Sequence, residues 1–280
     1  FWIIYNGEAF NYLELRSELE ARGHRFSTGT DTEVILHLYE DEGPACLERL
    51  NGQFAMAIWD ARERCLFLAR DRLGVRPLFY TIVDDRLLFG SEIKAILAHP
   101  GVRAEMDRDS LDQILTFWST LSPRTAFRNI VELPPGHYLL ACDGQVTVQV
   151  YWALDFTSES DGRRTDQDYL EELESLLIDA TRIRLRADVP VGAYLSGGLD
   201  SSLTAAIIRK YTGNSLDTFS IAFDDPQFDE SFFQRQMAAA LGTNHQVAYC
   251  TSPDIGAVFP DVIWHTETPV LRTAPAPLFL

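Results

Sequence analysis

The sequence predicts two regions of different fold class: an α+β region with much antiparallel sheet, followed by an α/β region with a parallel sheet. In the first half, short strand-like runs alternate with turn-forming residues, as in residues 54–92. Residues 155–167 are almost free of apolar side chains, which is typical of a linker. After them, helix-like and strand-like runs alternate, which favours a doubly wound parallel sheet. We therefore predict one domain at 1–154 and another at 168–280.

The first predicted helix lies near the start of the chain. NYLELRSELEARGHRF has the period of an amphipathic helix. Leu13, Leu15 and Leu19 would lie on its apolar side, and Gly23 would form its C-cap. Further along, RLLFGSEIKAILAHPG predicts a strand followed by a helix that ends at Pro-Gly.

A hairpin and a strand–helix alternation complete the predicted elements. ELPPGHYLLACDGQVTVQVYW predicts two strands around a turn at Asp143-Gly144. Beyond the linker, the short apolar run VPVGAYL predicts a buried strand. In order, the second half is predicted to contain a helix at 169–187, that strand at 189–195, a helix at 201–211, a strand at 216–223, a helix at 230–242 and a strand at 245–250.

The composition excludes some classes of protein. The chain has 280 residues and a formal net charge of -17, from 41 acidic and 24 basic residues. Nucleic acids and anionic membranes both select for basic surfaces, so neither is expected as the main partner. No apolar run approaches the ~20 residues that a membrane-spanning helix needs. We expect neither a nucleic-acid nor a membrane partner, and a homodimer stays open.

Four cysteines, Cys46, Cys65, Cys142 and Cys250, are scattered along the chain without a CxxC pair. This spacing does not suit a metal site, and a chain of this size does not need a disulfide framework. We expect all four to be small buried or half-buried apolar residues, in a reducing, cytoplasmic setting. The first residues, FWIIYNGE, and the last, APAPLFL, resemble cut ends, so we do not read localisation from the start of the chain.

The loop SGGLDSS, residues 196–202, joins a predicted strand to a predicted helix. Gly197 and Gly198 allow close backbone approach, and amides at a helix N-terminus favour an anion. Asp200 would repel a bare phosphate, so its presence makes sense if Mg2+ lies between the carboxylate and phosphate oxygens. The loop is neither a GxxxxGK[ST] nor a GxGxxG motif. The alternative is a serine-rich helix cap with glycines for a tight turn.

SGGLDSS, with YL before it and FSIAF downstream, resembles the pyrophosphate loop of the N-type ATP pyrophosphatases, and in particular the asparagine synthetase (glutamine-hydrolysing) family. The resemblance implies a PP-loop synthetase domain in which this loop grips the β- and γ-phosphates of ATP. An acceptor carboxylate attacks the α-phosphate, an acyl-adenylate forms, and pyrophosphate leaves with Mg2+. The implied ATP-binding residues are Leu195, Ser196, Gly197, Gly198, Asp200, Ser201, Ser202 and Ile221, with Asp200 also as the metal ligand.

The first half resembles the glutamine-hydrolysing domain of the same family, through YNGEAFNY, GTDTEVILHLYE, LNGQFAMAIWD, LARDRLGVRPLFY and FGSEIKAIL in that order. The resemblance implies an Ntn-hydrolase-like class II glutamine amidotransferase domain. Amide hydrolysis passes through an oxyanion that needs positioned donors. The Asn6 side chain and the Gly7 backbone N–H match those donors, and Asn6, Glu8 and Asp31 match glutamine contacts. No chemistry is assigned to RDRLGVRP.

The residues of these motifs also have plainer interpretations. Asn6-Gly7-Glu8 alone would suggest a type I′ turn. TDTE alone would suggest a helix N-cap with Glu33 near N2, and capping does not exclude binding. The family's nucleophile is an N-terminal cysteine, whereas residue 1 here is Phe, and the family's glutamine-gripping arginine would also precede this stretch. We therefore expect that this stretch alone does not hydrolyse glutamine.

One segment departs from the family pattern. Asparagine synthetases tend to carry D-E-P-x-x-D-P-S, where this chain has HTETPVLRTAPAP, residues 265–277. Thr268 and Arg272 stand where acidic residues would be, which reverses local charge and would alter the accepted carboxylate. A change in a surface loop is the alternative. The family's later S-G-[EG]-G-x-D-E segment would follow Leu280.

The residues and the resemblance together predict a glutamine-dependent, ATP-dependent ligase. It would amidate a carboxylic acid through an acyl-adenylate, converting aspartate to asparagine with release of AMP and pyrophosphate, with ATP and Mg2+ as cofactors. A relative acting on another acceptor, or a binding or regulatory relative without turnover, are the alternatives. The intact loop with Asp200 favours an enzyme.

Overall fold

The computed structural model describes residues 1–156, 164–212 and 216–280, which form two compact units. The first unit contains residues 1–156 together with Glu267–Leu271, and the second contains the rest of the described chain. Most of the predicted linker lies outside the described residues.

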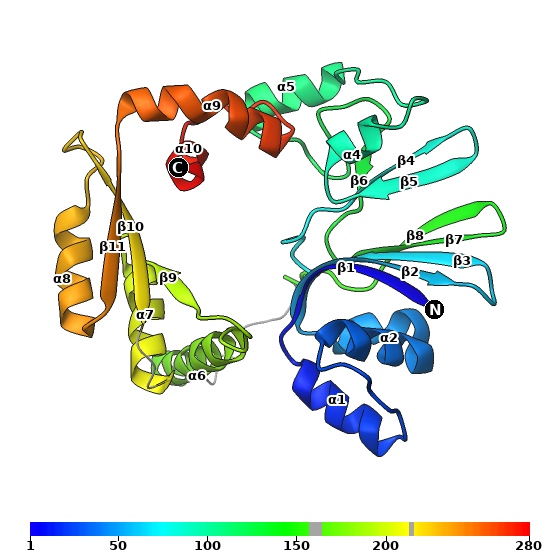
Figure 1. Ribbon diagram of the computed structural model, residues 1–280, viewed down its shortest axis with the longest axis horizontal. Helices are drawn as coiled ribbons and strands as arrows, with labels where there is room; N and C mark the ends of the chain where they lie inside the picture. Colours follow the sequence, from blue (N-terminus) through cyan, green and yellow to red (C-terminus); the bar gives the residue numbers. More distant parts are fainter. Residues whose placement is uncertain (157–163, 213–215) are drawn as a thin grey trace. The chain divides into compact units, whose positions relative to one another are not determined.

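Two antiparallel sheets form the centre of the first unit (Figure 1). The strand order is β1-β2-β3-β7-β8 in the larger sheet and β5-β4-β6 in the smaller one. The strands are β1 (Trp2–Ala9), β2 (Gly52–Asp60), β3 (Cys65–Arg70), β7 (His137–Cys142) and β8 (Gln145–Val150) in the larger sheet, with β4 (Phe79–Val83), β5 (Arg86–Gly90) and β6 (Val131–Glu132) in the smaller.

The larger sheet separates two apolar cores, because successive side chains of a strand point to opposite faces. From β2, Phe54, Met56 and Ile58 pack under the helices, whereas Ala55 and Ala57 face the second sheet. The layers are therefore helix, sheet, sheet and helix, which agrees with the predicted α+β class. The helices are α1 (Tyr12–Ala21), α2 (Asp31–Glu42), a 3-10 turn (Gly43–Ala45), α3 (Cys46–Arg49), α4 (Ile93–Leu97) and α5 (Arg108–Phe117).

The end of α1 follows the prediction, and one face residue does not. The Gly23 N–H donates to Glu20 O at 3.0 Å and the His24 N–H to Leu19 O at 3.0 Å, with φ +102° at Gly23. This is a Schellman ending, in which glycine takes the first position after the cap. Leu15 and Leu19 are buried, but Leu13 is 47% exposed, because residues two apart lie about 200° apart around a helix.

The predicted hairpin is confirmed, whereas the expectation of four unpaired cysteines is wrong. Asp143 and Gly144, with φ 50° and 77°, form the turn between β7 and β8. Cys65 and Cys142 stand opposite each other in the β3–β7 register, with Cα atoms 4.5 Å apart, and form a disulfide. The two residues are 77 positions apart, so the sequence alone offered no sign of their pairing. Cys46 and Cys250 are free and buried, as expected.

The second unit contains a parallel sheet with strand order β11-β10-β9 and helices between the strands (Figure 1). The three strands follow in chain order, so the reversal of a doubly wound sheet does not fall between the described strands. The elements are α6 (Asp166–Arg184), β9 (Gly192–Tyr194), α7 (Leu199–Thr212), β10 (Asp217–Phe223), α8 (Ser231–Leu241), β11 (Asn244–Cys250), α9 (Ser252–Thr266) and α10 (Pro275–Phe279).

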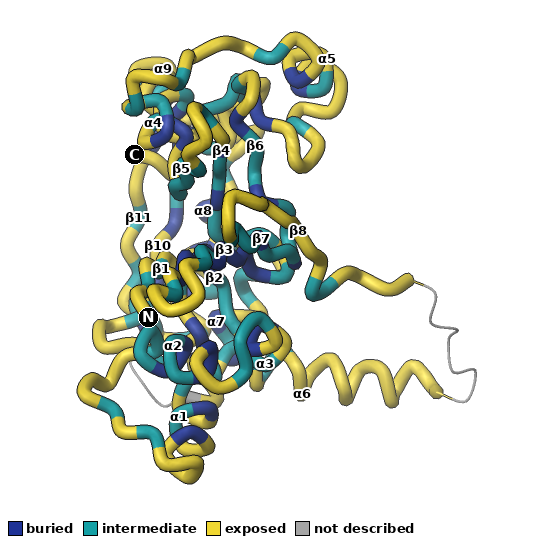
Figure 2. Tube along the Cα trace, turned by 90° about the vertical axis from the view of Figure 1, so that its right-hand side faces the viewer, coloured by how far each residue is buried: buried dark blue, intermediate teal, exposed yellow. Residues whose placement is uncertain are grey.

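Two expectations for the second unit need correction. The helix α6 begins inside the predicted linker, because Thr165 and Asp168 form a capping box. The strand β9 is not buried: Tyr194 is 68% exposed, since β9 is the last strand of the described sheet. Figure 2 shows exposed residues along α6, and no residue of this helix is buried. Among the described residues, no helix is both long and apolar enough to cross a membrane.

Candidate functional site

The segment Asn6-Gly7-Glu8 lies inside the strand β1, so the turn interpretation is excluded. The three residues pair with Ala55, Phe54 and Gln53 of β2. The neighbouring strand β2 leaves no room for a side chain at Gly7, because a Cβ there would lie 2.1 Å from Gln53 O. The close approach of the two strands therefore requires glycine at this position, independently of any role of its N–H as a hydrogen-bond donor.

Asn6 and Glu8 project from the same face of β1, because they are two residues apart in a strand. Asn6 pairs with Ala55, which packs toward the second sheet, and its Nδ2 donates to Ser91 Oγ at 3.1 Å. Ser91 directly follows β5 of that second sheet. The Asn6 amide is thus held by a residue from the opposite sheet and keeps a second N–H for another acceptor. Glu8 is exposed, with no polar partner among the described residues.

Asp31 lies at the start of α2 and is tied to the end of the same strand. Its Oδ2 accepts from the Ala9 N–H at 2.9 Å. Nearby, the Tyr5 hydroxyl is buried without a hydrogen-bond partner among the described residues. Burial and the Asp31 carboxylate both raise the pKa of Tyr5, so this phenol stays neutral. The four predicted residues of the glutamine site therefore lie along one strand and the helix end beside it.

The capping prediction for α2 holds with a shift of one position. Thr30 is the N-cap, and its Oγ1 accepts from the Glu33 N–H, which makes Glu33 N3 and not N2. The Glu33 carboxylate accepts from the backbone of Ser27 at 2.7 Å and of Thr28 at 2.6 Å. These hydrogen bonds, that of Ser27 first, lower the pKa of Glu33. Glu33 is thus a structural residue that fixes the turn before Asp31.

None of the four cysteines is placed to act as a nucleophile. Cys65 and Cys142 are joined to each other. Burial raises the pKa of Cys46 to about 12 and also raises that of Cys250, and a thiol must ionise to attack. The expectation that no cysteine of this stretch replaces the family's nucleophile therefore agrees with the structure.

The segment RDRLGVRP is structural, as expected. Asp71 is 1% exposed and accepts from the backbone N–H groups of Phe54, Leu73, Val75 and Arg76. Its carboxylate therefore folds the turn after β3 onto the neighbouring strand. A carboxylate with four backbone donors has no capacity left for a ligand.

In the second unit, the loop between β9 and α7 is held mainly by its own hydroxyl groups. Ser201 Oγ accepts from the Ser196 N–H at 3.1 Å and lies 2.9 Å from Ser196 Oγ. Ser196 Oγ in turn accepts from the Gly198 N–H at 3.3 Å. Gly197 has φ +89°, a conformation that favours glycine. The predicted serines and glycines thus form one network around the first turn of α7.

The buried residue Gln234 was missed by the sequence analysis. It lies on α8, is 3% exposed, and its Nε2 donates to Ile221 O at 3.0 Å and to Ser196 O at 3.4 Å. It therefore joins the β10 backbone to the loop. On the other side, Ser220 Oγ donates to Leu195 O. The one signal that could have identified Gln234 is its burial, and burial cannot be read from the sequence.

Asp200 is the second residue of α7 and is exposed. Its carboxylate has no hydrogen-bond or ion-pair partner among the described residues, in contrast to the carboxylates of Asp31, Asp71 and Glu33. Ser202, the last residue of the motif, is half-buried. An unpaired carboxylate beside a helix N-terminus fits a hard cation shared with phosphate oxygens, since Mg2+ prefers oxygen ligands.

The departing segment is divided between the units. Glu267 belongs to the first unit, where its carboxylate accepts from the backbone N–H groups of Ile93 at 2.5 Å and Lys94 at 2.6 Å. Because these two backbone groups and the Lys94 ammonium, 3.5 Å away, occupy its carboxylate, Glu267 is not a free acid for a ligand.

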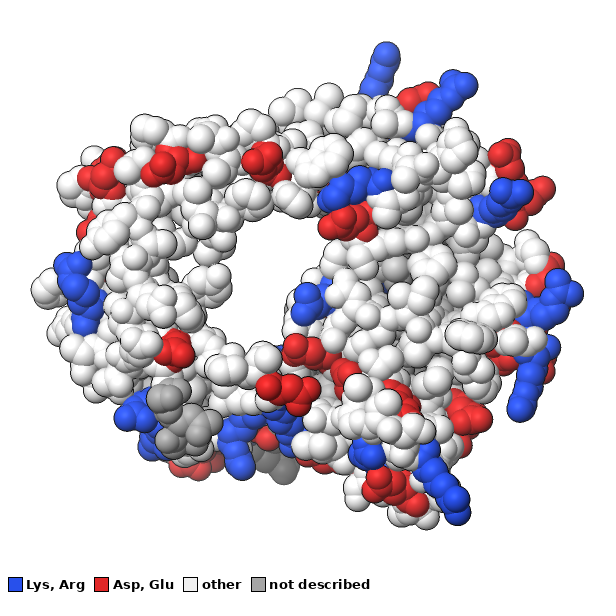
Figure 3. All heavy atoms as spheres, viewed as in Figure 1, with Lys and Arg blue, Asp and Glu red and all other residues white. Residues whose placement is uncertain are grey.

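Over the surface drawn in Figure 3, acidic and basic side chains are interspersed.

Comparison with known proteins matches both halves. The glutamine amidotransferase domain family matches residues 1–152 and the asparagine synthase family residues 172–280. Two asparagine synthetases (glutamine-hydrolysing) of Bacillus subtilis, numbers 1 and 3, are 34% and 41% identical over 281 and 268 residues. They cover 100% and 90% of this chain, which covers 44% and 43% of them.

An amidase, chyE, of Penicillium rubens is also similar, with 34% identity over 284 residues, 95% of this chain and 41% of that protein. The chain thus spans less than half the length of these relatives. The two domain matches follow each other in the order of the two units and together cover most of the chain. The chain therefore belongs to the asparagine synthetase (glutamine-hydrolysing) family, with a glutamine amidotransferase domain followed by a region that matches the asparagine synthase family.

Proposed function

We propose that the complete gene product containing this chain uses ATP and glutamine to amidate a carboxylic acid, with aspartate as the acceptor. The acceptor carboxylate would attack the α-phosphate of ATP, which gives an acyl-adenylate and releases pyrophosphate. Ammonia from glutamine would then attack the acyl carbon, and AMP would leave. Asparagine, AMP, pyrophosphate and glutamate would be the products.

The observation that carries this proposal is the loop 196–202. Its serine hydroxyls and glycine amides gather at the N-terminus of α7, where backbone N–H groups and the helix dipole favour an anion. Asp200 would bind Mg2+, which when present neutralises the departing pyrophosphate. Leu195, which is fully buried, directly follows β9, and Ile221 lies in the neighbouring strand β10; the two would flank the adenine.

The first unit supports the glutamine half of the proposal. Asn6 has an amide N–H left after its bond to Ser91, and it lies next to Gly7 in β1. A side-chain N–H and the following backbone N–H are the donors that an oxyanion needs. Glu8 has no protein partner among the described residues and would pair with the α-ammonium of glutamine, with Asp31 beside it at the strand end.

A different acceptor is the second candidate, favoured by the segment 265–277. Arg272 carries a positive charge where the family pattern has a carboxylate, and Thr268 is neutral. A guanidinium binds carboxylates in a fork geometry, so the acceptor would be an acid with a second negative group differently placed from that of aspartate.

The test follows pyrophosphate release and asparagine formation by the complete gene product with MgATP and glutamine, with and without aspartate. We expect aspartate-dependent release, and a fall of about 100-fold or more in Asp200→Asn. Asp179→Asn, an exposed carboxylate on α6, is the matched control and should be unchanged. No release in response to aspartate, together with intact glutamine hydrolysis, would favour the second candidate and direct the test to other carboxylic acids. Absence of both pyrophosphate release and glutamine hydrolysis would mean a binding or regulatory protein.

A further inference from the structure

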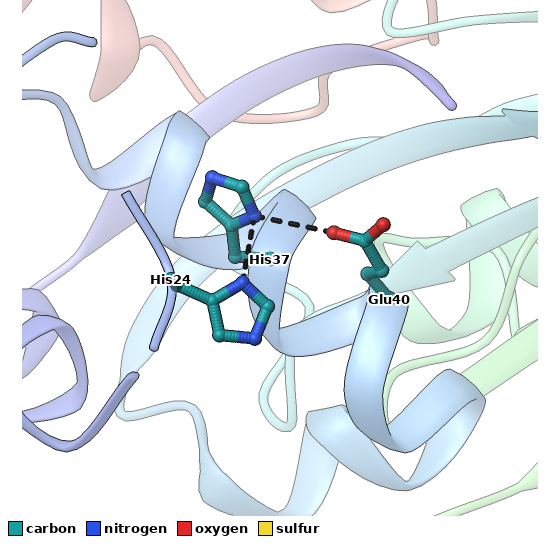
Figure 4. Close-up of side chains that lie close together, drawn as sticks. All are labelled: His24, His37 and Glu40. Atoms are coloured by element: carbon teal, nitrogen blue, oxygen red, sulfur yellow. Dashed lines mark hydrogen bonds and ion pairs between the residues drawn. The ribbon is translucent and has the colours of Figure 1, made fainter. Parts of the chain in front are cut away.

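A cluster of two histidines and a glutamate lies in the first unit, on α2 and the segment after α1. Of the described residues, His24, His37 and Glu40 present ligand atoms that all lie within 4.8 Å of one another. Figure 4 shows His24 coming from the segment after α1 and the other two from α2, with all three side chains converging. Nothing in the proposed amidation uses them.

The local sequence places each member. The Schellman ending of α1 turns the chain at Gly23 and brings His24 back toward α2. His37 and Glu40 are three residues apart on α2, so their side chains lie on one face of the helix. The cluster thus bridges two helices that pack against each other.

Two of the three distances between ligand atoms are close to those within a metal coordination sphere. His24 Nδ1 lies 3.1 Å from His37 Nδ1, and His37 Nδ1 lies 3.3 Å from Glu40 Oε2. Ligand atoms bound at about 2.0–2.1 Å around a tetrahedral Zn2+ lie about 3.3 Å apart. The side chains of His24 and His37 are 16% and 22% exposed and that of Glu40 is 48% exposed, which leaves water access for a fourth ligand.

The hydrogen bonds around the cluster decide which nitrogens are acceptors. His24 Nε2 lies 2.9 Å from Asp41 Oδ1, and because a carboxylate only accepts, this nitrogen carries the proton. With the proton on Nε2, the Nδ1 of His24 has a lone pair that points at His37. The Nε2 of His37 lies 3.9 Å from the Glu33 carboxylate, beyond hydrogen-bond distance. A carboxylate behind a metal-bound imidazole, as Asp41 lies behind His24, is the usual outer arrangement.

Without an ion, a proton on His37 Nδ1 can bridge to His24 Nδ1 or to Glu40 Oε2. A cation that displaced this proton would meet two nitrogen lone pairs and one carboxylate oxygen. We propose that His24, His37 and Glu40 bind one divalent transition-metal ion, Zn2+ being the best match to two imidazoles and a carboxylate, and that this ion clips the end of α1 to α2. A proton shared between the two histidines is the competing explanation.

The test is Zn2+ titration of the tag-free protein by calorimetry, after chelator treatment and dialysis. We expect one saturable site per chain and a rise in the melting temperature with Zn2+. The double variant His24→Gln/His37→Gln should lose affinity by about 100-fold or more, and Asp41→Asn by about tenfold. His99→Gln is the matched control, a histidine of the same unit outside the cluster, and should bind as the original does.

A second variant guards against misfolding of the double one. Glu40→Gln removes an exposed ligand without disturbing a core, and should weaken binding while leaving the circular dichroism unchanged. Co2+ bound in place of Zn2+ should show the visible absorption of a tetrahedral site in the original and not in the double variant. Absence of a saturable site in the original, or equal binding by a folded double variant, would overturn the proposal and leave the shared proton.

Discussion

The two candidate sites of this chain are held in different ways. In the glutamine segment, contacts of the backbone hold the residues: Gly7 lies close against the backbone of β2, and Asp31 accepts from the Ala9 N–H. In the nucleotide loop, side chains hold the backbone, through Ser196, Ser201 and the buried amide of Gln234. The first site should therefore fail together with its fold, whereas the second should lose ligand binding while its unit stays folded.

The largest effect is expected at Gly7. In Gly7→Ala the new methyl group meets backbone atoms of β2, which cannot rotate away, so the first unit should lose about 3 kcal/mol of unfolding free energy. Urea unfolding followed by fluorescence measures this. Gly197→Ala is the contrast, because its Cβ would lie 3.1 Å from the side-chain atom Phe233 Cβ. This variant should lose less unfolding free energy than Gly7→Ala, and its ATP affinity should fall. Equal losses of stability would contradict the comparison.

The disulfide gives the next effect. Reduction, or the double variant Cys65→Ser/Cys142→Ser, should lower the unfolding free energy of the first unit by about 2 kcal/mol, because it frees the loop between two residues 77 positions apart. The melting temperature with and without reductant checks this. Peptide mapping of the unreduced protein should find the two cysteines joined. Alkylation of both in the native protein would show that they are free thiols.

A smaller effect, confined to nucleotide binding, is expected at Gln234. Gln234→Leu removes the amide that links Ile221 O to Ser196 O, so the KM for ATP should rise about tenfold, or about 1.4 kcal/mol, with kcat changed less. Pyrophosphate release by the complete gene product at varied ATP measures this. Gln236→Leu, on the exposed side of the same helix, should behave as the original. An unchanged KM in Gln234→Leu would mean that the loop holds its shape without this amide.

The smallest effect is a pH dependence of the second unit. Burial, followed by the charge of Arg235, lowers the pKa of His245, and its Nε2 is buried without a partner among the described residues. A lowered folded-state pKa means that the stability is full above the unfolded value near 6.5 and is lost as the pH falls through the folded value.

The melting temperature should therefore fall by about 2 °C between pH 7.5 and pH 5 through this group. His245→Gln should show a smaller decrease than the original over the same range, since other acidic groups contribute equally in both proteins. The same decrease in both would remove His245 as a cause.

The sequence by itself determined the classes of the two regions, the helix ending at Gly23, the hairpin at Asp143-Gly144 and the loop 196–202. Each of these depends on neighbouring residues, whose periodicity and turn chemistry are visible in a single chain. Asn6, Gly7, Glu8 and Asp31 were predicted as glutamine contacts only through the family resemblance, since the same residues alone suggested a turn and a helix cap.

Only the tertiary structure decided which distant residues meet. The disulfide between Cys65 and Cys142, the anchoring of Asn6 by Ser91, the role of Gln234 and the cluster of His24 with His37 all join residues that are far apart in the chain. It also decided that β9 is exposed and Leu13 is not in a core. Burial and partnership arise when separate elements pack, and no local pattern records which element will cover a given face.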